Sequence, residues 1–292
     1  IIISGEHFVV ENKPALVAAI NLYSKVYVEE RYDEYFRIES KNEKVIHVIK
    51  ADYKGKILDY SGNKKTKKFL LPILKAVKKT LELSNKEFGK DIKKGFDIVI
   101  NSDIPYSAGL GSSATVAVAT SAAILKEITG KLNKELVWKA AFEAERIIHK
   151  MPSGIDITAA TYGGIFQFRK GSKPIFLKLE NFKGKFLVAY LGKRSQTGKI
   201  VEDVLRLKNE FPTVINPLYI SAEYITNLII NYLLANDLIN AGKLMYINHE
   251  LLSAIGTSNS KIDFLINLAK KKGAYGAKLT GAGRGGCIIA LV

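Results

Sequence analysis

The stretch that decides the fold runs from Gly95 to Ser113 and reads GFDIVINSDIPYSAGLGSS. The run from Gly95 to Ile100 predicts a strand, and the small residues from Ser113 to Thr129 predict a helix that Gly130 ends. A chain that turns through glycine from a strand into a helix presents free backbone N–H groups at the positive end of the helix dipole. The pattern therefore predicts a phosphate-binding loop.

Other kinds of loop have sequence requirements that can be compared with these residues. A tight turn capped by serine would have the same composition. A Walker loop would end in Gly-Lys-Ser/Thr, which is missing here. Gly109, Gly111 and Ala114 match the dinucleotide fingerprint, but that motif needs a further strand ending in an acidic residue. Glu127 falls inside the predicted helix instead, so the context disfavours a nicotinamide site.

Two acidic residues follow the loop. Glu145 lies late in a helix predicted from Lys134 to His149, and Asp156 follows a turn that begins at Pro152. Phosphoryl transfer needs a cation near the phosphates and a group that orients or deprotonates the attacking hydroxyl. Glu145 suits the first role and Asp156 the second. Equally, Asp156 could N-cap a helix from Ile157, and Glu145 could lie on a solvated face beside Arg146.

A third glycine-rich segment runs from Lys278 to Cys287 and reads KLTGAGRGGC. Its glycines lie between two strand-like segments and predict a tight loop that closes on a phosphate or a substrate, or a simple hairpin.

Composition limits the class of protein. Of the 292 residues, 47% are hydrophobic and 25% charged, as in globular proteins, and no apolar run is long enough to span a bilayer. The single cysteine, Cys287, predicts a reducing, cytoplasmic setting without metal clusters of Cys and His. The net charge of +16 suits an anionic substrate, and the basic stretch from Lys64 to Lys79 predicts a solvated helix face, since no nucleic-acid motif accompanies it. We expect neither nucleic acid nor a membrane as a partner.

The overall pattern predicts an α+β chain of two lobes, residues 1–181 and 182–292. Near the N-terminus it predicts a strand from Ile1 to Ser4 and a second strand around Phe8 and Val9. A helix is expected from about Lys68 to Leu83, and a glycine-interrupted hairpin at the C-terminus.

The three segments, in this order, resemble the signature motifs of the GHMP kinase superfamily, and the resemblance spans nearly the whole chain. Within it, Gly5 to Val10 with Pro14 to Leu16, and His149 to Asp156, resemble the mevalonate kinases. Asn248 to Leu252 resembles a late helix of that family. The implied fold has an N-terminal lobe like ribosomal protein S5 domain 2 and a ferredoxin-like C-terminal lobe, with ATP and substrate between them.

The resemblance also implies roles for individual residues. Asp156 would activate the substrate hydroxyl, Ser113 and Glu145 would bind Mg²⁺, and Glu6, His7 and Thr197 would contact mevalonate. The ATP phosphates would lie on Ser107, Ala108, Gly109, Leu110, Gly111, Ser112 and Ser113, and the third motif would contribute Gly281, Ala282 and Gly283. The family also places a lysine at the position that would precede Ile1. Arg284 stands where the family has glycine, and could bind phosphate or point into solvent.

The activity implied is ATP-dependent phosphorylation of mevalonate in isoprenoid biosynthesis. A phosphomevalonate kinase would use the same loop with more cations for its substrate, and the net charge leaves it open. A non-catalytic GHMP-like ATP-binding regulator is a third hypothesis, against which the joint presence of Asp156, Glu145 and Ser113 argues. A homodimer is compatible with the sequence.

Overall fold

The computed structural model describes residues 1–42, 45–63, 66–89, 92–105, 108–148, 153–192 and 197–292. The chain divides into two compact units. The first unit comprises residues 1–20, 107–110 and 163–292, and the second comprises residues 21–106 and 111–162. Both contain helices and strands, as the sequence predicts. Within the described ranges, no helix combines the length and the hydropathy needed to cross a bilayer.

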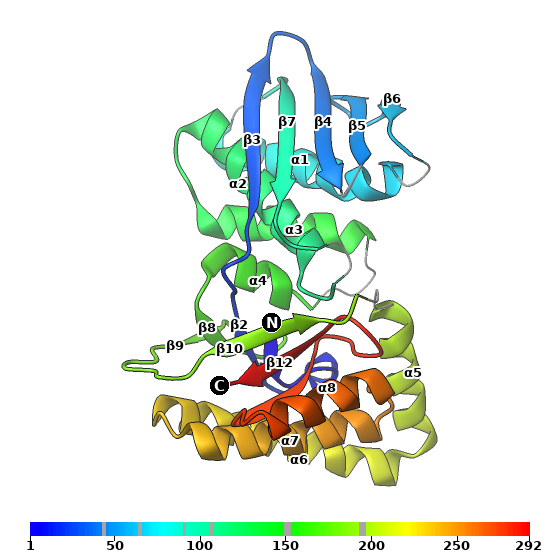
Figure 1. Ribbon diagram of the computed structural model, residues 1–292. Helices are drawn as coiled ribbons and strands as arrows, with labels where there is room; N and C mark the ends of the chain where they lie inside the picture. Colours follow the sequence, from blue (N-terminus) through cyan, green and yellow to red (C-terminus); the bar gives the residue numbers. More distant parts are fainter. Residues whose placement is uncertain (43–44, 64–65, 90–91, 106–107, 149–152, 193–196) are drawn as a thin grey trace. The chain divides into compact units, whose positions relative to one another are not determined.

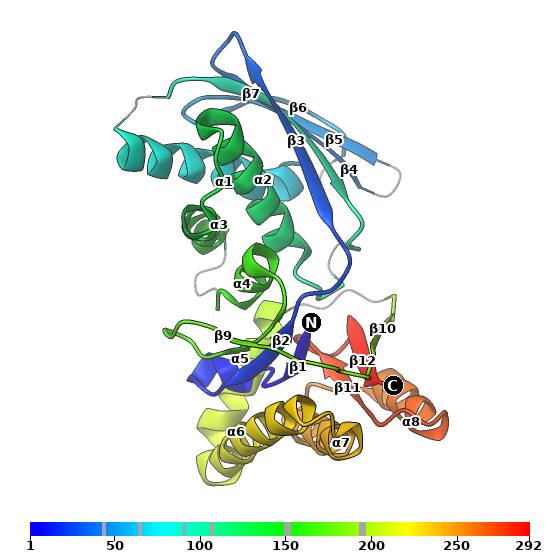
Figure 2. The ribbon, with the colours of Figure 1, turned by 90° about the vertical axis from the view of Figure 1, so that its left-hand side faces the viewer.

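The second unit is a mixed sheet with helices on one face (Figures 1 and 2). In spatial order its strands are β3 (Ser24–Arg31), β7 (Gly95–Ser102), β4 (Tyr35–Asn42), β5 (Val45–Asp52) and β6 (Ile57–Ser61). Strand β7 pairs parallel with β4 and antiparallel with β3. The helices are α1 (Thr66–Phe88), α2 (Ser112–Thr129), α3 (Lys134–Ile148) and α4 (Ile155–Tyr162). Helices α1 and α2 lie on the sheet, and α3 packs on both of them.

The alternation of buried side chains along β7 explains why the helices cover one face of the sheet. Phe96, Ile98 and Ile100 alternate along the strand and are buried, so they face the helices. Leu74 and Val77 of α1 belong to the same buried cluster. The strand that leads into the glycine loop is therefore a central, packed element of the unit.

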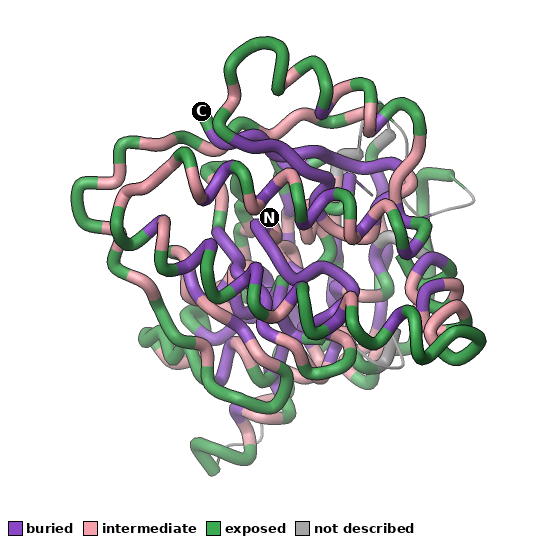
Figure 3. The backbone as a smooth tube through the Cα atoms, turned by 90° about the horizontal axis from the view of Figure 1, so that it is seen from below, coloured by how far each residue is buried: buried purple, intermediate pink, exposed green. Residues whose placement is uncertain are grey.

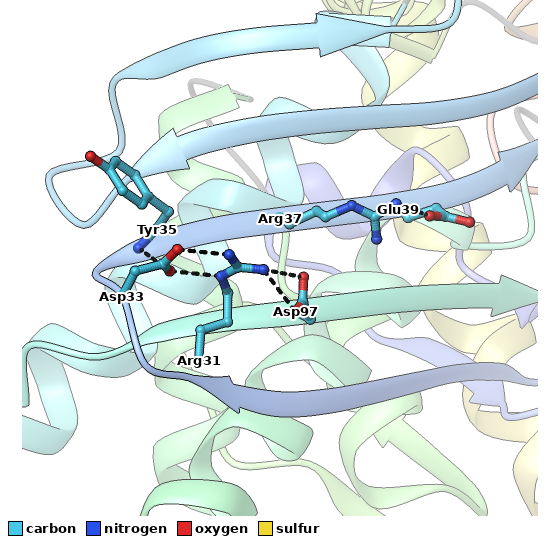
Figure 4. A network of polar contacts seen from close by, with 6 residues as sticks. All are labelled: Arg31, Asp33, Tyr35, Arg37, Glu39 and Asp97. Atoms are coloured by element: carbon cyan, nitrogen blue, oxygen red, sulfur yellow. Dashed lines mark hydrogen bonds and ion pairs between the residues drawn. The ribbon is translucent and has the colours of Figure 1, made fainter.

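An arginine between two aspartates fixes the turn from β3 to β4 (Figure 4). Arg31 donates from Nε to Asp33 Oδ1 at 2.7 Å and from Nη1 to Asp97 Oδ2 at 2.8 Å. The hydrogen bonds from Arg31 lower the pKa of Asp33 to about 2. The backbone N–H of Gly95 donates to the carbonyl oxygen of Asp33 at 2.9 Å, and a Cβ atom on Gly95 would stand 2.3 Å from that oxygen. Strand β7 thus begins in a defined register.

The first unit contains two antiparallel sheets. One has the order β1 (Ile2–Ser4), β2 (Ala15–Ala18), β8 (Ile165–Phe168) and β9 (Ile175–Leu177), and the other β10 (Phe186–Tyr190), β12 (Cys287–Leu291) and β11 (Gly276–Thr280). The longer helices are α5 (Thr197–Glu210), α6 (Pro212–Leu234), α7 (Leu238–Ala254) and α8 (Ser260–Lys271). Helices α7 and α8 pack on β11, and α6 on β1 and β2. In Figure 3 the backbone that leads away from the N-terminus is drawn as buried, in agreement with its place in this core.

Two glycines allow α7 to approach β11 closely. A Cβ atom on Gly242 would stand 2.1 Å from the carbonyl oxygen of Tyr275, and one on Gly276 would stand 2.4 Å from that of Gly242. Backbone contact at this distance excludes any side chain at either position. Strand β11, which leads into the third glycine-rich segment, is held firmly against the helix.

The prediction of a strand around Phe8 and Val9 is wrong. These residues belong to the 3-10 helix η1 (Phe8–Glu11). His7 and Asn12, on either side, have φ values of 59° and 62°, so the chain reverses within a single turn. Phe8 is fully buried by this turn, edge-on to the ring of Tyr219 with 4.9 Å between ring centroids. An apolar pair buried by a tight turn cannot be told from a short strand by composition alone.

The division into compact units differs from the boundary predicted between residues 181 and 182. Strand β2 pairs with β8, and Ile3 and Leu16 lie in one buried cluster with Ile229 and Leu291. The start of the chain thus packs with its C-terminal half, which no boundary at one chain position can represent.

Two lysines of the basic stretch on α1 contact neighbouring side chains. Lys67 lies 4.3 Å above the ring of Tyr60, and Lys79 pairs with Glu82 at 2.6 Å. Lys64 and Lys65 lie outside the described residues.

Candidate active site

The glycine loop opens helix α2 without a side-chain cap. Gly111 is the N-cap residue, with a φ of 69°, and no side chain in the described ranges accepts a hydrogen bond from the first turn. Gly109 has a φ of 79° and no described atom within 4 Å of the place where a Cβ would lie. The serine-capped turn is therefore not the observed arrangement, and the first-turn N–H groups can receive an anion. Ser113 is exposed at this end of the helix, and Ser107 lies outside the described residues.

Asp156 lies against the end of this loop. A Cβ atom on Gly111 would stand 3.1 Å from Cβ and Cγ of Asp156 and 3.3 Å from its Oδ1. Helix α4 begins at Ile155, so Asp156 lies in its first turn and does not cap a helix from Ile157. Its side chain reaches solvent, yet the protein around it removes enough water for desolvation to raise its pKa. In the described part of the chain, no hydrogen bond to its carboxylate is seen.

Helix α3 supports the turn that carries Asp156. Trp138 Nε1 donates to Thr158 Oγ1 at 2.9 Å, and its ring stacks on Phe142 with 4.8 Å between centroids. Gly154 has a φ of 82° and contacts both rings, since a Cβ there would stand 3.3 Å from Phe142 and 3.4 Å from Trp138. The turn before Asp156 is thus packed against two aromatic side chains. His149, Lys150, Met151 and Pro152, on which the resemblance was partly based, lie outside the described residues.

Glu145 is a partly buried acid with no ion pair to any described residue. Its neighbour Arg146 is exposed and pairs with Glu143 at 2.9 Å, whereas Glu145 itself is partly buried and not on the solvated face. Burial, and then repulsion from Asp156, raises the pKa of Glu145 to about 7. A buried carboxyl group whose proton affinity is raised by a second carboxylate is a natural site for a cation.

The described residues suit a magnesium site in which phosphate oxygens supply some of the ligands, rather than a site formed by protein ligands alone. No group of three or more His, Cys, Asp or Glu side chains gathers at metal-binding distance in the part of the chain that the structure describes. Mg²⁺ is commonly held by one or two protein oxygens together with substrate phosphates and water. Glu145 and the hydroxyl of Ser113 could supply such ligands.

In the first unit, Glu6 is fully buried with a lysine. Lys278 of β11 donates from Nζ to Glu6 Oε1 and, at 2.6 Å, to the carbonyl oxygen of Leu279. The side chains of Lys278 and Glu6 are 0% and 1% exposed. Burial raises the pKa of Glu6 and lowers that of Lys278, while the attraction between the two charges opposes both shifts. Glu6 Oε2 has no hydrogen-bond partner among the described residues.

His7 is tied to the third glycine segment. Its Nε2 lies 2.9 Å from the carbonyl oxygen of Ala282. A carbonyl oxygen only accepts, so Nε2 carries the proton and Nδ1 of the neutral ring is an acceptor. Burial lowers the pKa of His7, which keeps the ring neutral. A φ of 59° at His7 shows that the backbone is strained to hold this orientation.

The third segment forms a loop between β11 and β12, as the glycines predict. Gly281 and Gly283 have φ values of 79° and 82°. A Cβ on Gly281 would stand 3.3 Å from the carbonyl oxygen of Gly109, and Cys287 Sγ lies 3.4 Å from that of Ala108. Ala108 and Gly109 of the first glycine loop therefore lie in contact with the third segment.

Arg284 neither extends freely into solvent nor has a free guanidinium. Its Nη1 pairs with Asp203 Oδ2 of α5 at 2.6 Å, and its Nε donates to the carbonyl oxygen of Gly256 at 2.8 Å. Thr197 is exposed at the first position of α5, and the residues before it, 193–196, lie outside the described ranges. The pair with Asp203 thus joins the third glycine loop to the helix that begins at Thr197.

Sequence reasoning assigned no role to Lys278, Trp138 or Asp203. For Lys278 a signal existed, because it is a lysine in a strand of otherwise apolar or small residues. Asp203 carried no such signal, since an acidic residue on an amphipathic helix is ordinary.

The sequence is similar to known proteins. The family model described as GHMP kinases N terminal domain matches residues 73–164, and that described as GHMP kinases C terminal matches residues 229–292. The mevalonate kinase of Thermococcus gammatolerans is 36% identical, and the match covers 100% of this chain and 86% of the relative.

Two solved structures align over nearly the whole chain. The L. major mevalonate kinase in complex with R-mevalonate has a TM-score of 0.79 at 29% identity, covering 100% of this chain and 84% of that one. The Streptococcus pneumoniae phosphomevalonate kinase with phosphomevalonate and AMPPNP has a TM-score of 0.79 at 16% identity, covering 99% and 89%. The second likeness shows the fold alone.

Proposed function

Because the chain belongs to the GHMP kinase family, we propose that it transfers the γ-phosphate of ATP to the 5-hydroxyl of mevalonate. The observation that carries the kinase part is the contact of Asp156 with Gly111, since it sets a carboxylate beside the open first turn of α2. The choice of mevalonate is supported by the relatives that match the full chain.

Each residue has a defined part in the proposed reaction. The N–H groups of Gly111, Ser112 and Ser113 bind phosphate oxygens at the start of α2. Asp156 accepts the proton of the attacking hydroxyl, and its raised pKa makes it a stronger base than an ordinary aspartate. Glu6 Oε2 and His7 Nδ1 offer acceptors to the hydroxyl groups of the substrate.

Magnesium bound by Glu145 and Ser113 would neutralise charge on the β- and γ-phosphates of ATP. The raised pKa of Glu145 supports this assignment, because a cation there relieves the repulsion from Asp156. We further place the enzyme in the cytoplasm, where its single cysteine stays reduced.

The test is an assay of ADP release with mevalonate and phosphomevalonate supplied in parallel. Turnover with mevalonate and none with phosphomevalonate is the expected result. The reverse preference would assign the chain to phosphomevalonate phosphorylation. ATP binding without turnover of either substrate would identify a non-catalytic regulator and overturn the proposal.

A further inference from the structure

The charged side chain of Lys278 is fully buried, which costs free energy. Every residue of β11 is buried, and the Lys278 side chain has no exposed surface. Its ammonium group reaches only Glu6 and the carbonyl oxygen of Leu279 among the described residues. A buried ion pair stabilises a fold no better than well-packed apolar side chains of similar volume. The pair therefore points to a role other than stability.

The second oxygen of Glu6 indicates that role. Glu6 Oε2 and, on the next residue, His7 Nδ1 are buried and have no hydrogen-bond partner in the described ranges. Both are acceptors, because a carboxylate paired with Lys278 has no hydrogen to donate and because the Nε2–H of His7 is bound to Ala282. Adjacent free acceptors suit a ligand with O–H groups and disfavour a carboxylate or phosphate at the same place.

We propose that Lys278 is a positioning residue that holds Glu6 in its anionic, acceptor-only form for a hydroxyl of the alcohol substrate. The inference rests on the proposed function, because only there does Glu6 contact a substrate. Strand β11 and the loop after it would then orient both acceptors, through Lys278 for Glu6 and through Ala282 for His7.

Removal of Lys278 takes away the largest influence that opposes the effect of burial on the pKa of Glu6. Burial is the largest influence that raises the pKa of Glu6, and Lys278 is the largest that lowers it, with a smaller contribution from a backbone hydrogen bond. His7 and His249, the nearby histidines, have pKa values lowered by burial and are neutral near neutral pH. In Lys278→Met, Glu6 is therefore expected to be protonated at neutral pH and ionised only at alkaline pH.

The experiment is a double-mutant cycle with Lys278→Met, Glu6→Gln and the double variant, with kcat/KM for mevalonate measured from neutral to alkaline pH. Lys278→Met should lower kcat/KM about 10-fold to 100-fold at neutral pH and recover part of it as pH rises. In the Glu6→Gln background the same change should have no further effect. Lys278→Arg should retain more activity, and Lys272→Met, an exposed lysine of the same unit, should behave as the parent.

Thermal unfolding of each variant separates loss of fold from loss of positioning. The double variant replaces both charges, so it folds even where Lys278→Met alone does not. Equal losses from Lys278→Met in the parent and in the Glu6→Gln background, or a loss independent of pH, would overturn the inference.

A direct titration makes the test independent of the substrate. The side-chain carboxyl ¹³C signal of Glu6, assigned by its loss in Glu6→Gln, should titrate at higher pH in Lys278→Met than in the parent. An unchanged titration would refute the role of Lys278 even in an active enzyme. A parent inactive with mevalonate but with the shifted titration would refute the proposed function and leave only the effect of Lys278 on the Glu6 carboxyl supported.

Discussion

The backbone of Gly111 passes so close to Asp156 that a Cβ atom on the glycine would stand 3.1 Å from both Cβ and Cγ of the aspartate. The end of the phosphate loop and the proposed base are thus in contact within one compact unit. This contact sets the spacing between the first-turn N–H groups of α2 and the Asp156 carboxylate, so a single methyl group on Gly111 can change that spacing.

We expect Gly111→Ala to lower kcat by about tenfold or more, because the methyl group displaces Asp156. The φ of 69° at Gly111 adds a strain of about 1 kcal/mol for alanine. Gly130→Ala is the matched control, since Gly130 ends the same helix with the same φ of 69° and has open space around its Cβ position. Steady-state kinetics and thermal unfolding of both variants are the measurements. Equal activity in the two would show that the contact with Asp156 is unimportant.

Asp156→Asn should lower the rate of phosphoryl transfer about 10²-fold or more and leave ATP binding nearly intact, because the amide keeps the shape and lacks the base. Single-turnover kinetics and ATP titration separate the two effects. Asp59→Asn, an exposed aspartate of the same unit, is the control and should behave as the parent. Near-normal turnover in Asp156→Asn would remove it from the chemistry.

Local signals in the sequence predicted the elements around the phosphate loop well. The helix predicted from Ser113 to Thr129 is observed as Ser112–Thr129, because glycines mark both of its ends. The helix predicted from about Lys68 to Leu83 extends from Thr66 to Phe88, since polar residues continue it as far as Gly89. The C-terminal hairpin is confirmed by the pairing of β11 with β12.

Contacts between distant residues could not be predicted in this way. Lys278 and Glu6 are 272 positions apart, and Arg284 and Asp203 are 81 apart. Neither pair has a periodicity that links its members, because the connection is made by the packing of separate strands and helices. The sequence therefore predicted substrate roles for Glu6 and His7 but not the strand that orients them.

Glu145→Gln should weaken the magnesium dependence of activity, which a magnesium titration at fixed ATP would measure. In the parent, the pKa of about 7 implies that the Glu145 carboxylate, which is proposed to bind magnesium, becomes protonated as pH falls through 7. The apparent affinity for magnesium should decrease over that range in the parent and stay flat in the variant. Glu143→Gln, whose carboxylate pairs with Arg146, is the control. An unchanged magnesium requirement would return Glu145 to the role of a structural acid.

The raised pKa of Glu145 also affects the stability of the metal-free protein. Between the ordinary pKa of a glutamate and about 7, the folded chain binds more protons at Glu145 than the unfolded chain does. The contribution of Glu145 to the free energy of unfolding therefore falls as pH rises through this window. Denaturant unfolding should find Glu145→Gln more stable than the parent at alkaline pH, and a less stable variant there would contradict the pKa.

Arg284 is expected to connect the third glycine loop to α5 and not to bind ATP. Its guanidinium already pairs with Asp203 and the Gly256 carbonyl, so Arg284→Gly should leave KM for ATP and for mevalonate unchanged. The partly exposed pair contributes within about 1 kcal/mol, and glycine relieves the left-handed φ of 51°, so the net change in unfolding free energy is small. Asp203→Asn should remove the same connection, and the two changes should not add, whereas Arg206→Ala leaves that pair in place. A rise of about tenfold in KM for ATP in Arg284→Gly, absent from Asp203→Asn, would instead show that the guanidinium turns to the nucleotide when ATP binds.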